Sequence, residues 1–212
     1  MVCLPFIIAN LGEMKIVIKK IGLFLVLVVC ISLMGCGGKI RYSQSTPEAK
    51  DFHPERIAVL AVDTDAFPAA EGIGEQIITD MLEKKHWYTK VESPAIFKAS
   101  LEKDEDLKKT ISEYLKKLKM VNFSDPDLSK KIGERLNVQA FFVGKIDLWN
   151  YSIEDKKKFA KVGMEIRLID AATGKVIWRA NHNRIKDYWL FKPDLSEIAK
   201  GLVKDIINYV PR

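Results

Sequence analysis

The sequence predicts a single α/β domain in which a mixed β-sheet is packed with helices. A short, almost entirely apolar run at 56–62 is typical of a strand that is covered on both faces. Amphipathic helix patterns follow it, and three successive strand patterns occupy 138–185. Along the chain the elements have the order β-α-β-α-α-β-β-β-α, which favours one mixed sheet covered by helices.

The first half of the domain alternates strand and helix patterns. Apolar residues recur every three or four positions along 71–85 and along 104–120, as they do on the buried face of a helix. Between these helices, 87–92 is predicted to be a second strand, and 94–101 can form an additional short helix that the order above does not count. Ser124 or Asp125 can cap a further helix, with Pro126 in its first turn, that ends near Asn137.

The second half is predicted to be a strand meander followed by a helix. Alternation of apolar and charged residues marks strands at 138–149, 159–170 and 175–185. Gly174 supplies a positive φ to the turn between the last two strands. Asp194 and Glu197 form a capping box at the start of the last helix, 194–210.

The N-terminus has the pattern of an export signal. Lys19 and Lys20 precede an apolar block of 14 residues, 21–34, which is shorter than the 20 or so residues that usually span a bilayer. Gly35 and Cys36 follow this block directly, in the string Leu33-Met34-Gly35-Cys36. An uncleaved anchor helix is the alternative, but we expect cleavage between Gly35 and Cys36.

The string at the junction resembles the lipobox of bacterial lipoproteins. The resemblance implies that Cys36 becomes the first residue of the mature chain and carries lipid, including an acyl group such as palmitate. Residues 1–35 would then be the signal peptide and take no part in the fold. Met1 and Met14 are alternative starts, because a chain beginning at Met14 already contains a complete signal.

Removal of this signal changes the composition in two ways. Cys36 becomes the sole cysteine, which excludes an intrachain disulfide and a zinc site built from cysteines. The net charge falls from +6 to +4, because three lysines and one glutamate are lost. This modest positive charge favours solubility rather than a polyanionic partner.

The segment after Cys36 is polar and contains Gly, Ser and Pro without an apolar period. Such composition cannot bury enough surface to become ordered, so 36–54 is predicted to be a flexible tether. The folded periplasmic domain is then expected to occupy 55–212.

Two aspartates are the strongest catalytic candidates. Asp63 and Asp65 directly follow the first strand, where α/β proteins often bind ligands. Their spacing is similar to the first motif of haloacid-dehalogenase-type phosphatases, in which the first aspartate attacks phosphate. A later acidic pair that such enzymes need cannot be placed here, so a loop with aspartates bonded to backbone amides is the competing interpretation.

Other polar motifs point to structure rather than chemistry. Gly72 and Gly74 lack the lysine and third glycine of a phosphate-binding loop. His53, His86 and His182 have no metal-ligand spacing, so neither a metal nor another cofactor is expected. The lysines and acidic residues of 102–131 interleave, as on a solvated helix face, with contact of the lysines to anionic headgroups or glycans as the alternative.

Aromatic residues late in the chain leave two interpretations open. Trp149 and Tyr151 lie near a polar turn and can either cover the core or form an interface with a partner. The same alternatives hold for Trp178, Trp189 and Phe191, with Trp178 favoured as a core residue.

Three segments together resemble the periplasmic domain of CsgG-like and TolB-N-terminal-like envelope proteins. They are the strand IAVLAV, the segment KIGERLNVQAFFVGKI, and the hairpin VGMEIRLIDAATGKVIW. The resemblance covers about 56–209 and implies an anticodon-binding-domain-like fold that serves as an interaction module. The curli secretion lipoprotein, which has this domain, forms a pore by inserting amphipathic hairpins into the membrane. The corresponding residues here, 99–121, are charged and have a helix pattern, so we do not expect this chain to form a channel alone.

The expected function follows from the signal and the resemblance. We expect a non-catalytic lipoprotein, anchored through Cys36, that assists the assembly, export or regulation of a cell-surface structure. Gly37 is compatible with an outer-membrane location, with the domain facing the periplasm. Other envelope proteins are the expected partners, nucleic acid is not, and a homo-oligomer is left open. A periplasmic phosphohydrolase that uses Asp63 and Asp65 is the alternative.

Overall fold

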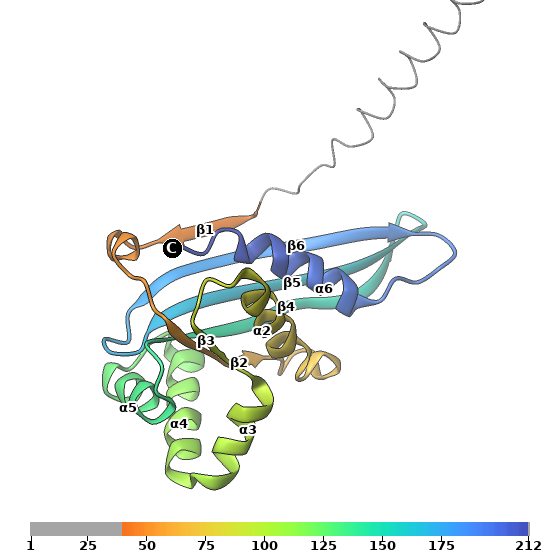
Figure 1. Cartoon of the computed structure of the whole chain (residues 1–212). Helices are drawn as coiled ribbons and strands as arrows, with labels where there is room; N and C mark the ends of the chain where they lie inside the picture. The colour runs from red at the N-terminus through yellow and green to blue at the C-terminus, as the bar shows by residue number, and fades with distance from the viewer. Residues whose placement is uncertain (1–39, 212) are drawn as a thin grey trace, which may run out of the picture. The chain divides into compact units, whose positions relative to one another are not determined.

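The computed structural model describes residues 40–211, which fold around one six-stranded sheet (Figure 1). The strand order is β1-β6-β5-β4-β2-β3. β2 pairs in parallel with β3 and β4, and the other pairs are antiparallel. The strands are β1 (Tyr42–Ser45), β2 (Arg56–Asp63), β3 (Lys90–Glu92), β4 (Ala140–Glu154), β5 (Lys157–Asp170) and β6 (Val176–Tyr188).

Helices cover both faces of this sheet, as the buried run of β2 requires. Ile57 and Val59 of β2 join one core with α2 and α6, whereas Ala58 and Leu60 join a second core with α3, α4 and α5. The helices are α2 (Ile73–Lys85), α3 (Pro94–Lys103), α4 (Glu105–Val121), α5 (Pro126–Leu136) and α6 (Leu195–Ile207), with short 3₁₀ turns η1 (Pro47–Lys50) and η2 (Pro68–Ala70).

The predicted fold class, a single α/β domain with a mixed sheet, is confirmed. Asp125 and Asp194 cap α5 and α6 as predicted, since each accepts backbone hydrogen bonds at the start of its helix. The predicted capping box is not formed, because the Glu197 carboxylate accepts from Lys200 and, within the part of the chain that the structure describes, makes no bond to the Asp194 N–H. Among residues 40–211, no helix combines the length and the apolar character needed to cross a membrane.

The β4–β5 hairpin is longer than predicted. Sequence analysis ended the first strand at 149 and began the second at 159, but the two strands pair as far as Glu154 and Lys157. Asp155 and Lys156 both have positive φ, at 48° and 66°. Two such residues make a tight two-residue turn, so the predicted polar turn is shorter and most of its residues belong to the two strands.

Part of the segment predicted as a flexible tether is ordered. Tyr42–Ser45 forms β1, which pairs with the edge of β6, and Ala49 of η1 is buried. The prediction considered only apolar burial, whereas β1 is held by backbone pairing and by polar side chains. Ser43 accepts a hydrogen bond from the Trp178 indole, and Gln44 accepts two from Arg179. The compact unit therefore begins at Ile40 rather than at 55.

Candidate functional site

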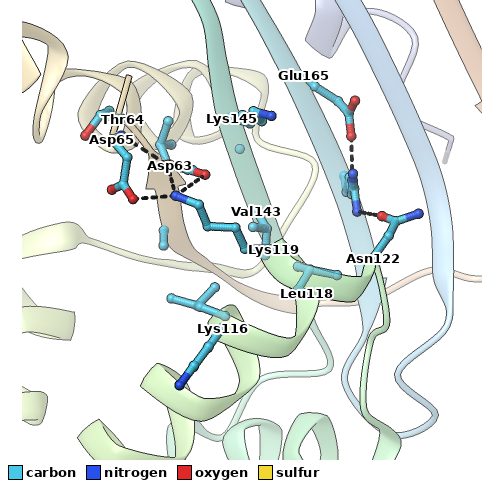
Figure 2. Close-up of a pocket in the computed structure, with 15 residues that line it drawn as sticks. Asp63, Thr64, Asp65, Lys116, Leu118, Lys119, Asn122, Val143, Lys145 and Glu165 are labelled. Atoms are coloured by element: carbon cyan, nitrogen blue, oxygen red, sulfur yellow. Dashed lines mark hydrogen bonds and ion pairs between the residues drawn. The ribbon is translucent and has the colours of Figure 1, made fainter. Parts of the chain in front are cut away.

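A cavity of about 600 Å³ lies beside the carboxyl end of β2 (Figure 2). Its walls come from the end of β2, the last turns of α4, and the neighbouring strands β4 and β5. The charged residues that line it are Asp63, Asp65, Lys116, Lys119, Lys145, Glu165 and Arg167.

Two glycines allow α2 and β4 to approach the end of β2 closely. A Cβ atom on Gly74 of α2 would lie 2.8 Å from Cγ1 of Val62, and one on Gly144 of β4 would lie 2.9 Å from Cγ2 of the same residue. The Val62 N–H also donates to Oε1 of Glu75 at 2.8 Å. These contacts fix the last residues of β2 and so position Asp63.

Lys119 holds both candidate aspartates. Its Nζ lies 3.0 Å and 2.9 Å from the two carboxylate oxygens of Asp63, and 2.5 Å from Oδ2 of Asp65 (Figure 2). The backbone N–H of Asp65 donates to Oδ1 of Asp63 at 3.1 Å. The two carboxylates and the lysine therefore form one cluster.

The cluster shifts the pKa values of Asp63 and Lys119. Partial burial raises the pKa of Asp63, but the hydrogen bonds from Lys119 and Asp65 and the charges of Lys119 and Lys145 lower it below its ordinary value. Hydrogen bonds to Asp65 and Asp63 raise the pKa of Lys119. Asp63 and Lys119 are consequently both charged at neutral pH.

A second polar group forms the opposite wall. Nε of Arg167 lies 2.5 Å from Oε1 of Glu165, and its Nη1 donates to Oδ1 of Asn122 at 2.6 Å (Figure 2). Asn122 ends α4 with a left-handed φ of 52°. The arginine thus ties the end of α4 to the polar face of β5.

The arrangement restricts what the aspartates can do. A carboxylate that already accepts hydrogen bonds from a lysine and has a low pKa is a poor proton acceptor. General-base chemistry at Asp63 would therefore require Lys119 to move away. Within residues 40–211, no three His, Cys, Asp or Glu side chains are grouped so as to hold a metal ion. His182 lies elsewhere, buried, with Nδ1 accepting from the Arg41 N–H at 3.2 Å.

The remaining candidate residues are dispersed. Gly35 and Cys36 lie outside the described residues. Trp149 packs into the core with 9% of its surface exposed, which leaves little of its ring for a partner. Tyr151 is half-buried, and its hydroxyl donates to the carbonyl oxygen of Pro193 at 2.7 Å.

Sequence analysis missed Lys119 and Arg167 as site residues. Lys119 is separated from Asp63 by 56 positions, and it has the same helix spacing as the solvated lysines around it. Only the packing of α4 beside β2 brings the two together. Alternation along β5 did place Arg167 and Glu165 on one polar face, which is the single signal that the sequence offered.

Comparison with known proteins shows a shared fold. No protein-family model matches the chain, and no curated protein sequence is similar to it. PelC from Paraburkholderia phytofirmans, solved as a dodecamer of a single-substitution variant, is 18% identical with a TM-score of 0.50, over 82% of this chain and 100% of that one.

Other solved structures are similar to a lesser degree. The lipoprotein GNA1162 from Neisseria meningitidis is 13% identical with a TM-score of 0.46, over 72% of this chain and 94% of that one. The hypothetical protein CT253 from Chlamydia trachomatis is 11% identical with a TM-score of 0.49, over 74% and 95% of the two chains. The likeness to the PelC variant, with its TM-score of 0.50, shows that the chain has a fold similar to that of PelC.

Proposed function

We propose that the chain is a lipid-anchored, non-catalytic accessory protein of a bacterial cell envelope. The observation that carries the proposal is the junction at Gly35-Cys36, directly after a short apolar block and two lysines. Only three residues separate Cys36 from Ile40, where the compact unit begins. The domain would therefore be held close to the membrane.

The proposed location is the periplasmic side of the outer membrane. A domain of the CsgG-like or TolB-N-terminal-like kind would act there in the assembly, export or regulation of a surface structure. The likeness in fold to PelC supports an interaction module of this type. The aspartates bound by Lys119 support a role without catalysis, since neither carboxylate is free.

Lipid labelling tests the anchor. Wild-type protein expressed in cells fed radioactive palmitate should incorporate label and appear in outer-membrane fractions. Cys36→Ser should remain an unprocessed precursor without label. Cys30→Ser is the matched control, because it removes a cysteine of the same apolar block and should be labelled like wild type. Equal labelling of the Cys36 variant would contradict the proposal.

Self-association is a second part of the proposal. The PelC structure is a dodecamer, and we propose that this chain also forms a homo-oligomer, together with other envelope proteins as partners. Light scattering of the detergent-solubilised lipoprotein gives its mass. A monomer at every concentration would remove this part without affecting the anchor.

A phosphohydrolase is the second candidate, and one observation favours it. Asp63 and Asp65 lie at the carboxyl end of β2, in the parallel part of the sheet, and both line the cavity. The test is hydrolysis of a generic phosphate ester in the presence of magnesium. Asp80→Asn in α2 is the control, because Asp80 does not line the cavity. Activity that is lost in Asp63→Asn and kept in Asp80→Asn would establish the phosphohydrolase. Absence of activity would favour the accessory protein.

A further inference from the structure

Three consecutive apolar side chains project from the loop between β6 and α6. Trp189, Leu190 and Phe191 are 83%, 78% and 88% exposed. Single exposed apolar residues are ordinary on a protein surface, but a contiguous group of large ones marks a place of contact with a partner or a membrane.

The structure fixes this loop at both ends, so its exposure is not that of a free terminus. Tyr188 closes β6, and its ring packs edge-on against Tyr151 with 6.1 Å between the ring centroids. Tyr151 donates to the Pro193 carbonyl at 2.7 Å, and Nζ of Lys192 lies 3.7 Å from the centroid of the same ring. The three apolar residues are therefore presented outward between two anchored points.

The loop shares its end of the sheet with the β4–β5 hairpin tip (Figure 1). Ile153 of β4 pairs with Lys158 of β5, which pairs with Tyr188 of β6. Ile153 is itself 71% exposed, and the exposed tip carries three lysines, Lys156, Lys157 and Lys158, against two acids, Glu154 and Asp155. An apolar tip flanked by cations matches the apolar boundary and the phosphate groups of a lipid surface.

The N-terminal end of the domain points to the same end of the sheet. β1 runs antiparallel to β6, with Ser45 beside Trp178 and Tyr42 beside Asn181. Followed backwards, the chain thus advances along β6 toward Tyr188. Four peptide units between Cys36 and Ile40 span at most about 14 Å, so a lipid on Cys36 keeps the bilayer within short reach.

We propose that Trp189, Leu190 and Phe191 insert into the bilayer to which Cys36 is attached. This inference rests on the proposed lipid anchor and adds a second contact, which fixes the orientation of the domain. Tryptophan favours the membrane interface, where its ring can be buried while a polar edge stays hydrated, and the leucine and phenylalanine side chains add apolar area. The opposite end of the sheet, with the β5–β6 turn, then faces away from the membrane.

A fluorescent probe on the full lipidated chain tests the contact. The sequence has cysteines only at 3, 30 and 36, so a lipidated mature chain has no free thiol and Leu190→Cys provides a single labelling site. The labelled protein is reconstituted into vesicles of phosphatidylethanolamine and phosphatidylglycerol that carry nitroxide-labelled lipid. Ala172→Cys, an exposed site on the β5–β6 turn at the other end of the sheet, is the matched control.

We expect the probe at 190 to be quenched by the nitroxide lipid and shielded from iodide, with the reverse at 172. Replacing Trp189 and Phe191 by serine in the Leu190→Cys chain should reduce the lipid quenching. Equal behaviour at 190 and 172 would overturn the membrane contact. Shielding from both quenchers would also overturn it, since a second copy or another protein would then cover the loop. Palmitate labelling tests separately whether Cys36 carries lipid, so failure of the loop contact and failure of the anchor are distinguishable.

Discussion

Lys119 at the end of α4 contacts both carboxylate oxygens of Asp63 at the end of β2, at 3.0 Å and 2.9 Å. The pair joins the helical layer of one sheet face to the last residue of a central strand. Asp65 shares the same ammonium group at 2.5 Å. One cation therefore pairs with two acids, and the cluster depends on the helix ending where it does.

Lys119→Met should raise the pKa of Asp63 toward its ordinary value of 3.8. In the wild type the pKa of Asp63 is lowered in the folded state, so its ionised form stabilises the fold above about pH 4, and that contribution is lost as pH falls through the folded pKa. The variant should lose less stability on acidification. Urea unfolding at about pH 6 and about pH 3, together with an NMR titration of Asp63, measures both effects.

Lys116→Met is the control for this variant. Lys116 lines the same cavity from the same helix, but it forms no ion pair within residues 40–211. Its removal should leave the titration of Asp63 almost unchanged. An identical pKa of Asp63 in wild type and Lys119→Met would show that the contact does not persist in solution.

Gly74→Ala should destabilise the protein by about 1–3 kcal/mol, because its new Cβ would overpack a well-filled core. That atom would lie 2.8 Å from Cγ1 of Val62, which is itself buried. Adding Val62→Ala should recover part of the loss, so the two changes should not be additive. Thermal unfolding of the two single variants and the double variant gives the coupling.

Gly201→Ala is the matched control, since it makes the same substitution inside α6. Its Cβ would meet the guanidinium of Arg184, the mobile end of a long side chain. Displacing this surface ion pair should cost at most about 1 kcal/mol. Equal losses for Gly74 and Gly201 would mean that the contact with Val62 does not decide the result.

The central elements were predictable because their signals are local. The apolar run of β2, the helical spacing in α4 and α6, and the alternation along β5 each reflect burial of one face or both. Gly174 was also predictable, since the turn between β5 and β6 needs its φ of +69°. Each of these features is determined by residues that lie within a few positions of it in the sequence.

The features that the sequence did not reveal are those that depend on distant partners. β1 is polar throughout and is ordered by Trp178 and Arg179, which lie 135 positions after their partners in β1. Lys119 becomes a site residue only because α4 packs beside β2. The turn at Asp155 and Lys156 has positive φ at residues other than glycine, so composition alone indicated a longer polar turn.

Ser43→Ala should destabilise the protein by about 1 kcal/mol and loosen β1. The Ser43 hydroxyl accepts from the Trp178 indole at 3.0 Å, and Trp178 is buried, so the variant leaves a buried donor without its partner. Ser45→Ala is the control, because the Ser45 hydroxyl makes no hydrogen bond within the described part of the chain. Amide exchange of 42–45 should accelerate in the first variant only, and equal exchange in both would contradict the role of the indole.

Tyr114 should set the alkaline limit of stability. Its ring is buried against Phe141, and burial raises the pKa of its phenol to about 12. An unfolded tyrosine loses its proton near pH 10, at about its ordinary pKa, so above this pH the folded state retains a proton that the unfolded state has released. Tyr114 therefore leaves the free energy of unfolding unchanged below about pH 10. As pH rises toward 12, the free energy of unfolding falls by about 3 kcal/mol at most.

Tyr114→Phe tests this limit, because the variant lacks the titrating hydroxyl. It also loses the hydrogen bond of 2.7 Å between Tyr114 and Ser124, which should cost about 1 kcal/mol at neutral pH. Denaturant unfolding at about pH 8 and about pH 11 should therefore show a smaller alkaline loss in the variant than in the wild type. Parallel losses in the two proteins would mean that other groups, such as the lysine ion pairs, govern the alkaline limit.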